Sequence, residues 1–149
     1  PPQEFVVPAA IGLTYAKVSG DWNPIHLPYF ARLFGVKEPI VHGMWSLGHA
    51  LGQIILRDRD GKNVGLGNET HHPIFVDVRW LKMMYMPSTA VQLSSMRQER
   101  VHDEETRLHY PWNCFASNAL LATKEFCVKN KKDEVLLVGS VSWQETKST

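Results

Sequence analysis

The sequence predicts an α+β domain in which helical segments come first and a run of antiparallel strands follows. In the first half of the chain, apolar residues recur at the spacing of a helix, whereas in the second half they partly alternate at the period of a strand. The 149 residues suit one domain, and a hydrophobic content of 44% is enough to fill its core. We therefore expect a single domain over residues 1–149. Because the sequence does not begin with Met, we expect that domain to have been processed, tagged or cut from something longer.

Three helices are expected in the first half. The segment Pro8–Gly20 predicts a short helix, because Pro suits an early helical position and Gly suits its end. A second brief helix is expected over Pro28–Gly35. The longest helix is expected from Gly43 to about Leu56, and since it is apolar nearly all round, it is predicted to be buried. Its glycines, Gly48 and Gly52, disfavour a helix, so we expect close packing against a neighbour to compensate.

The second half is expected to form four strands joined as an antiparallel sheet. Alternating and β-branched residues mark these strands, with a polar hairpin loop at 130–133 between the last two. The polar, proline-containing stretch 102–113 is expected to be a long excursion or a bent edge. The four predicted strands are Phe75–Lys82, Thr89–Met96, Leu120–Val128 and Val135–Trp143.

Composition excludes several classes of function. Lys and Arg number 16 against 15 Asp and Glu, so there is no basic surplus to bind a nucleic-acid backbone. No apolar run approaches the ~20 residues of a membrane helix. Cys114 and Cys127 do not form a disulfide framework, which favours ordinary thiols in a reducing compartment. We expect a soluble intracellular protein that binds neither nucleic acid nor membrane, in a compartment left open.

An acidic residue and a histidine lie five positions apart across a constrained turn. Asp21 and His26 flank Asn23 and Pro24, and a carboxylate beside an imidazole is a ready acid–base pair. The alternative is structural, because an Asp in a turn often caps the next segment and a histidine often serves only packing.

A second stretch, Pro39-Ile-Val-His-Gly-Met44, leads directly into the predicted buried helix. A glycine in the first turn of such a helix leaves its N–H free and lets a ligand approach closely, while the helix dipole favours negative charge there. This is what an oxyanion site requires. The two stretches together suit the making or quenching of an enolate.

The stretches SGDWNPIH at 19–26 and PIVHGM at 39–44 together resemble the R-specific enoyl-CoA hydratases among the MaoC-like dehydratases. The resemblance implies a hot-dog fold, in which a curved antiparallel sheet wraps the long helix Gly43–Leu56. It also implies reversible hydration of trans-2-enoyl thioesters to R-3-hydroxyacyl thioesters, as part of fatty acid metabolism.

The resemblance also assigns roles to residues of this sequence. Asp21 and His26 match the catalytic pair, which holds one water between them. Asn23 matches an asparagine that orients the turn or the thioester, and the backbone N–H of Gly43 matches the oxyanion donor. His42 either anchors the loop before the helix or belongs to the active site, and these two readings stay open.

The substrate carrier is expected to be CoA or an acyl-carrier protein, with no metal and no further cofactor. Lys82 and Arg79 are candidates for the phosphates of CoA, although solvated lysines at a sheet edge are the ordinary alternative. Trp22 and Trp45 occupy positions from which they would narrow the acyl entrance. The paired histidines at 71–72 lack the further ligands of a metal site, and no nucleotide-binding glycine pattern is present.

Two rival functions share the expected fold. One is an acyl-CoA thioesterase, which would direct water to C1 rather than C3, and the other is a non-catalytic subunit that binds acyl groups. Because a single hot-dog sheet has exposed edges, we also expect a homodimer. Chain length, carrier, physiological direction and the presence of a second hot-dog half elsewhere in a longer chain are left open.

Overall fold

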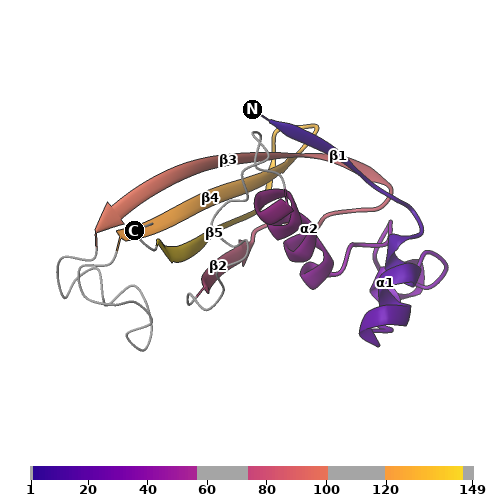
Figure 1. Ribbon diagram of the computed structural model, residues 1–149. Coiled ribbons are helices and arrows are strands. Elements are labelled where there is room, and N and C mark those ends of the chain that lie inside the picture. Colours follow the sequence, from indigo (N-terminus) through magenta and orange to yellow (C-terminus); the bar gives the residue numbers. More distant parts are fainter. Residues whose placement is uncertain (1, 57–73, 101–119, 146–149) are drawn as a thin grey trace.

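The computed structural model describes residues 2–56, 74–100 and 120–145 (Figure 1). Four helical segments and five strands make up this part of the chain. In order they are β1 (Gln3–Val7), α1 (Ile11–Ser19), the 3-10 helices η1 (Pro24–His26) and η2 (Ala31–Phe34), α2 (Gly43–Leu56), β2 (Ile74–Trp80), β3 (Ser88–Arg100), β4 (Leu120–Asn130) and β5 (Val135–Glu145).

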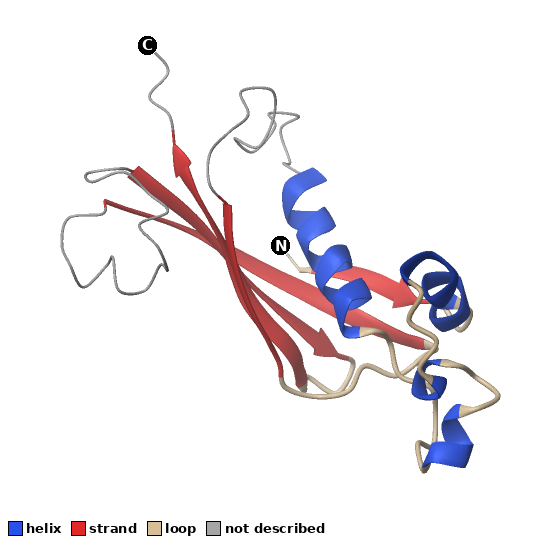
Figure 2. Ribbon diagram, turned by 90° about the horizontal axis from the view of Figure 1, so that it is seen from below, coloured by secondary structure: helices blue, strands red, loops and turns tan. Residues whose placement is uncertain are grey.

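The five strands form one antiparallel sheet in the order β1-β3-β4-β5-β2. The sheet is curved, and α2 lies against its concave face (Figure 2). The segments α1, η1 and η2 lie beyond the end of the sheet at which β1 ends and β3 begins (Figure 1). The structure therefore has the α+β arrangement that the sequence predicts, with the long helix where the resemblance implies it.

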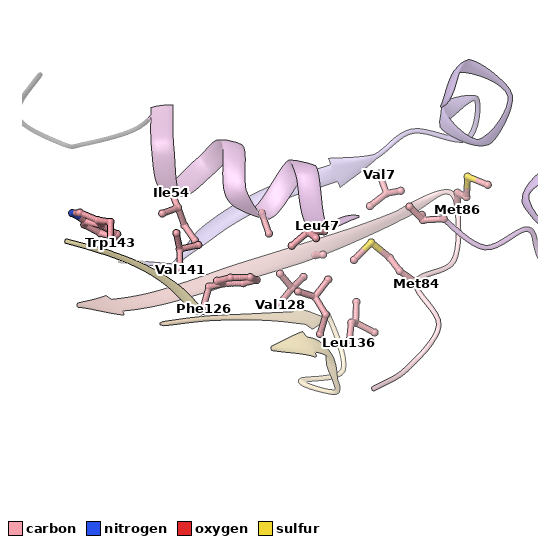
Figure 3. Close-up of a cluster of buried hydrophobic side chains, with 14 of the residues drawn as sticks. Val7, Leu47, Ile54, Met84, Met86, Phe126, Val128, Leu136, Val141 and Trp143 are labelled. Atoms are coloured by element: carbon pink, nitrogen blue, oxygen red, sulfur yellow. The ribbon is translucent and has the colours of Figure 1, made fainter. Parts of the chain in front are cut away.

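The core forms where α2 meets the sheet. Leu47 and Ile54 of α2 face Phe126, Val128 and Val141 of the central strands, and all five side chains are at most 9% exposed (Figure 3). Each Å² of apolar surface buried in this contact contributes roughly 25 cal/mol of stability, so the contact holds the helix on the sheet. The apolar pattern of residues 43–56 thus correctly predicts a helix packed on the sheet.

Glycine ends α1 as predicted. Gly20 adopts the left-handed conformation, with φ of 76°, and its N–H bonds to the carbonyl of Ala16 at 2.9 Å. A side chain would strain this conformation, so glycine suits the position. The second helix is shorter than expected, because a turn in which the N–H groups of Phe30 and Ala31 both bond to the carbonyl of Leu27 precedes it.

One strand is missed, and the other four have bounds that differ from those predicted. The first strand, β1, is missed, because five residues between prolines carry too weak a pattern and only pairing with β3 defines them. The strand β3 continues past Met96 to Arg100, since its polar end pairs with the start of β4. The strand β2 stops at Trp80, where the N–H groups of Leu81 and Lys82 both turn to the carbonyl of Leu136.

The remaining predictions about the fold have different outcomes. The hairpin at 130–133 is confirmed: the side chain of Asn130 accepts hydrogen bonds from the N–H groups of Lys132 and Glu134, at 2.9 and 3.0 Å. The excursion at 102–113 lies outside the described residues.

Among the described residues, nothing lies within 4 Å of a Cβ built at Gly48 or Gly52 of α2, so the expected close packing is not found there. No helix in the described ranges is long and apolar enough to cross a membrane.

Gly12 allows α1 to pack directly on the segment that carries His26. A Cβ at Gly12 would overlap the backbone carbonyl oxygen of His26, whereas a Cβ at Gly48 would meet open space. We predict that Gly12→Ala lowers the free energy of unfolding by about 1–3 kcal/mol through overpacking. Gly48→Ala, the matched control, should raise it by up to ~1 kcal/mol because alanine favours the helix. Urea denaturation measures both, and equal stability of the two variants would contradict the close contact.

Candidate active site

The turn after α1 fixes the position of Asp21. Its N–H bonds to the hydroxyl of Ser19 at 3.2 Å, and one of its carboxylate oxygens accepts the N–H of Asn23 at 3.2 Å. The side chain of Asp21 is nevertheless 54% exposed. The carboxylate therefore caps the turn with one oxygen, while the other oxygen faces the neighbouring histidines.

Asn23 begins the short helix that carries His26. Its side-chain oxygen accepts the N–H of Ile25 at 3.3 Å, its carbonyl accepts the N–H of His26 at 3.0 Å, and Pro24 follows in the first helical position. This geometry agrees with the expectation that the asparagine orients the turn.

His26 is buried and its ring is held in one tautomer. Its Nδ1 lies 2.8 Å from the carbonyl oxygen of Ile40, and because a carbonyl can only accept, this nitrogen carries the proton. The other nitrogen, Nε2, is then a free base in the neutral ring. Burial lowers the pKa of His26 below its ordinary value of 6.5, with a further lowering by His42, while the bond to Ile40 and the charge of Asp21 oppose the shift.

His42 lies between the two predicted catalytic residues. Its ring is 2% exposed and stacks on that of His26 with 3.8 Å between the ring centroids. Its Nε2 donates to the backbone carbonyl of Asp21 at 3.0 Å and lies 4.0 Å from the carboxylate. Polar side-chain atoms of Asp21, His26 and His42 all lie within 4.8 Å of one another. The structure thus brings all three together, and His42 contacts both of the other two residues.

The hydrogen bonds of the two imidazoles bear on metal binding. Nδ1 of His26 and Nε2 of His42 each donate a proton to a backbone carbonyl, so neither of these nitrogens offers a lone pair to a metal ion in this arrangement.

Gly43 begins α2 directly beside this cluster. The first N–H groups of a helix have no acceptor within it, so the first turn presents donors to a ligand. The indole of Trp80 packs on Gly43, 3.4 Å from where a Cβ would lie, and its Nε1–H is shared between the carbonyl of Gly43 at 3.2 Å and the hydroxyl of Ser46 at 3.1 Å. Sequence analysis missed Trp80, because nothing in a strand pattern reveals which helix end it reaches.

Two hollows meet at Gly43 and Trp80, which line both of them. The smaller, of about 290 Å³, is also lined by Asp21 and His42, and the larger, of about 1010 Å³, by His26. The predicted catalytic pair is therefore reached from two sides. The two hollows join at the first turn of α2.

The remaining predicted site residues lie at different distances from this centre. Lys82 lines the larger hollow and its Nζ bonds to Glu134 at 2.7 Å. Arg79 instead lines a hollow of about 600 Å³, because alternate strand residues point to opposite faces and Trp80 points to this one. Trp22 and Trp45, expected to narrow the acyl entrance, line neither hollow among the described residues.

Comparison with known proteins identifies relatives of this chain. A family model described as a MaoC like domain matches residues 6–107. The chain is 29% identical over 123 residues to the peroxisomal multifunctional enzyme type 2 of Mus musculus, covering 79% of the chain and 16% of that protein. It is 36% identical over 86 residues to the 3-hydroxyacyl-thioester dehydratase X of Mycobacterium tuberculosis, covering 57% of the chain and 26% of that protein. The chain therefore spans only a minor part of either relative.

The fold has solved counterparts. The (R)-hydratase from A. caviae involved in PHA biosynthesis superposes with a TM-score of 0.66 at 17% identity, over 98% of this chain and 93% of that one. This likeness confirms the hot-dog fold. Some other chains of similar fold come from complexes of two different proteins. Since the matched family model covers more than half of the chain and every residue of the cluster, the chain belongs to the family of MaoC-like dehydratase domains, whose enzyme class is hydro-lyase.

Proposed function

We propose that this chain catalyses the reversible hydration of trans-2-enoyl thioesters to R-3-hydroxyacyl thioesters. The observation that carries the proposal is the placement of Asp21 and His26 within 4.8 Å of each other, beside the first turn of α2. An acid–base pair next to unpaired backbone donors meets both requirements of the reaction, which are a positioned water and stabilisation of an enolate. The names of the two relatives above, a multifunctional enzyme and a hydroxyacyl-thioester dehydratase, agree with it.

The mechanism assigns one water to the pair. As the water oxygen bonds to C3, Nε2 of His26 accepts a proton from it. The proton passes from His26 to the carboxylate of Asp21, which delivers it to C2 of the enolate, so that the pair ends as it began. The thioester oxygen, negative in the enolate, accepts the N–H of Gly43. His42 holds the carbonyl of Asp21 and is a positioning residue.

The proposed product has R configuration. If both groups act on the same water, the hydroxyl and the proton reach the same face of the enoyl plane. The carrier is CoA or an acyl-carrier protein, with Lys82 at the edge of the larger hollow as the candidate for its phosphates. Arg79 lines a different hollow and is the weaker of the two candidates named from the sequence.

Incubation with crotonyl-CoA tests the function against its two rivals. Loss of the enoyl absorbance indicates hydration, release of free CoA indicates a thioesterase, and neither change indicates a non-catalytic acyl-binding subunit. Coupling the product to an S-specific 3-hydroxyacyl-CoA dehydrogenase should give no NADH, because that enzyme does not oxidise the R product.

The predicted pair should be essential to the reaction, and the carboxylate of Asp21 should be dispensable for the fold. General acid–base groups contribute about 10²–10⁴-fold, so Asp21→Asn and His26→Ala should each lower kcat/KM by at least ~10². The two losses should not add, since both side chains act on one water. Asp21→Asn should keep its melting temperature, because an asparagine oxygen still accepts the N–H of Asn23 at this exposed turn.

Asp77→Asn is the matched control, since this exposed carboxylate lies away from both hollows that meet at Trp80. It should keep full activity. If Asp21 only caps the turn, Asp21→Asn should instead lower the melting temperature and leave the activity per folded molecule unchanged. A folded Asp21→Asn protein with near-parental hydration of crotonyl-CoA would exclude the catalytic assignment.

The lowered pKa of His26 makes a prediction about pH. Because the folded protein binds this proton less tightly than the unfolded chain does, the neutral base should persist below pH 6.5, and stability should fall as pH drops from 6.5 to the folded pKa. Titration of the histidine ring signals by NMR measures the midpoint. His26→Gln identifies the signal by removing it, and a midpoint above 6.5 would contradict the buried, neutral base.

A homodimer is proposed for the assembly. In the described part of the chain, β1 and β2 are the outer strands of the sheet, and the β2 side exposes Val76, Trp80, Leu81 and Met83. Apolar residues along an open edge favour pairing with another chain. Sedimentation at micromolar concentration should give a dimer with two equivalent sites. An active monomer under the same conditions would contradict this.

A further inference from the structure

Trp80 is the one residue besides Gly43 that lines both hollows at the candidate site, among the residues that the structure describes. Its ring is 46% exposed, yet its position is fixed on two sides. One face packs on Gly43, and its N–H is shared between the Gly43 carbonyl and the Ser46 hydroxyl. Because the indole packs on Gly43 and its only polar atom is hydrogen-bonded, the ring has a fixed position and separates the two hollows.

The two hollows differ in chemistry. The larger is lined near the β4–β5 hairpin by Lys82, Lys131 and Lys132, which suit the phosphates of a thioester carrier. The described residues that line the smaller include no Lys or Arg, and Tyr15, Met44 and the indole form its apolar surface. An acyl thioester has one anionic end and one apolar end, so these linings match its two halves.

We infer that Trp80 determines the acyl-chain specificity of the site, by closing the smaller hollow around a short acyl group while the phosphate-bearing arm lies in the larger hollow. This inference rests on the proposed function, since it needs a thioester as the ligand. The thioester carbonyl then lies at Gly43, where the hollows meet, and the adjoining C2 and C3 atoms lie between Asp21, which lines the smaller hollow, and His26, which lines the larger. The indole blocks an acyl chain too long for about 290 Å³.

Binding of saturated thioesters tests this without depending on catalysis. Calorimetry gives Kd for butyryl-CoA and octanoyl-CoA with the parental protein and with Trp80→Leu. One added methylene in an apolar pocket changes affinity by about 10-fold or more, so removing the indole should shift the ratio of the two Kd values at least ~10-fold toward octanoyl-CoA. Trp22→Leu is the matched control, since that exposed tryptophan lines neither hollow, and should leave the ratio unchanged.

Two further variants test which hollow holds which half. Met44 lines only the smaller hollow and Met83 only the larger, and both are more than half exposed, at 61% and 56%. Met44→Trp should weaken the binding of butyryl-CoA about tenfold and leave the Kd for CoA itself within about twofold of the parental value. Met83→Trp should weaken the binding of CoA and of butyryl-CoA by the same factor. If Trp80→Leu does not fold, Trp80→Phe keeps a smaller aromatic ring at this position and should shift the ratio by a smaller amount in the same direction.

The outcomes separate the inference from the proposed function. An unchanged ratio in Trp80→Leu, the reverse pattern in the two methionine variants, or no binding of either thioester overturns the inference. Selective binding as expected together with no hydration of crotonyl-CoA supports the inference and overturns the proposed function.

Discussion

The candidate site depends on the hydrogen bonding of residues 39–41, which join its two motifs. On one side, Ile40 donates its N–H to the carbonyl of Ile25 at 3.1 Å and accepts Nδ1–H of His26 at 2.8 Å. On the other side, Val41 donates to the carbonyl of Met84 at 2.8 Å. Because Gly43 and α2 follow at once, these bonds set the distance between the imidazole of His26 and the end of the helix. Loss of this pairing would separate His26 from the first turn of α2.

Burial of two imidazoles side by side is costly unless each has a partner. Here His26 donates to Ile40 and His42 donates to Asp21, so each ring has one nitrogen satisfied and fixed as a donor. The same burial that shapes the core lowers the pKa of His26, which favours the neutral ring with Nε2 available to accept a proton. The burial of His26 therefore accounts both for its packing and for its lowered pKa. The carboxylate of Asp21 remains half-exposed, where water reaches it.

The hot-dog arrangement places the candidate site at one end of α2. One side of the helix, with Leu47 and Ile54, is buried against the sheet, and its first turn lies at the two hollows (Figure 3). Trp80 closes that turn from the last position of β2, at the edge of the sheet. A strand end, a helix start and a turn after α1 thus meet at Gly43. The size of the space around Gly43 depends on a side chain that comes from far along the chain.

The sequence alone determined the helix Gly43–Leu56, the succession of helices and then antiparallel strands after β1, and the choice of Asp21 and His26 as a candidate pair, because these depend on local periodicity and on short motifs with fixed chemistry. Tertiary structure decided the rest. It placed His42 between the pair, turned Arg79 to the face opposite Trp80, and defined β1 through pairing with β3. Each of these depends on contacts between segments distant in sequence, which no local pattern encodes. A tryptophan in a strand gives no sign that its N–H will reach a helix 37 residues earlier.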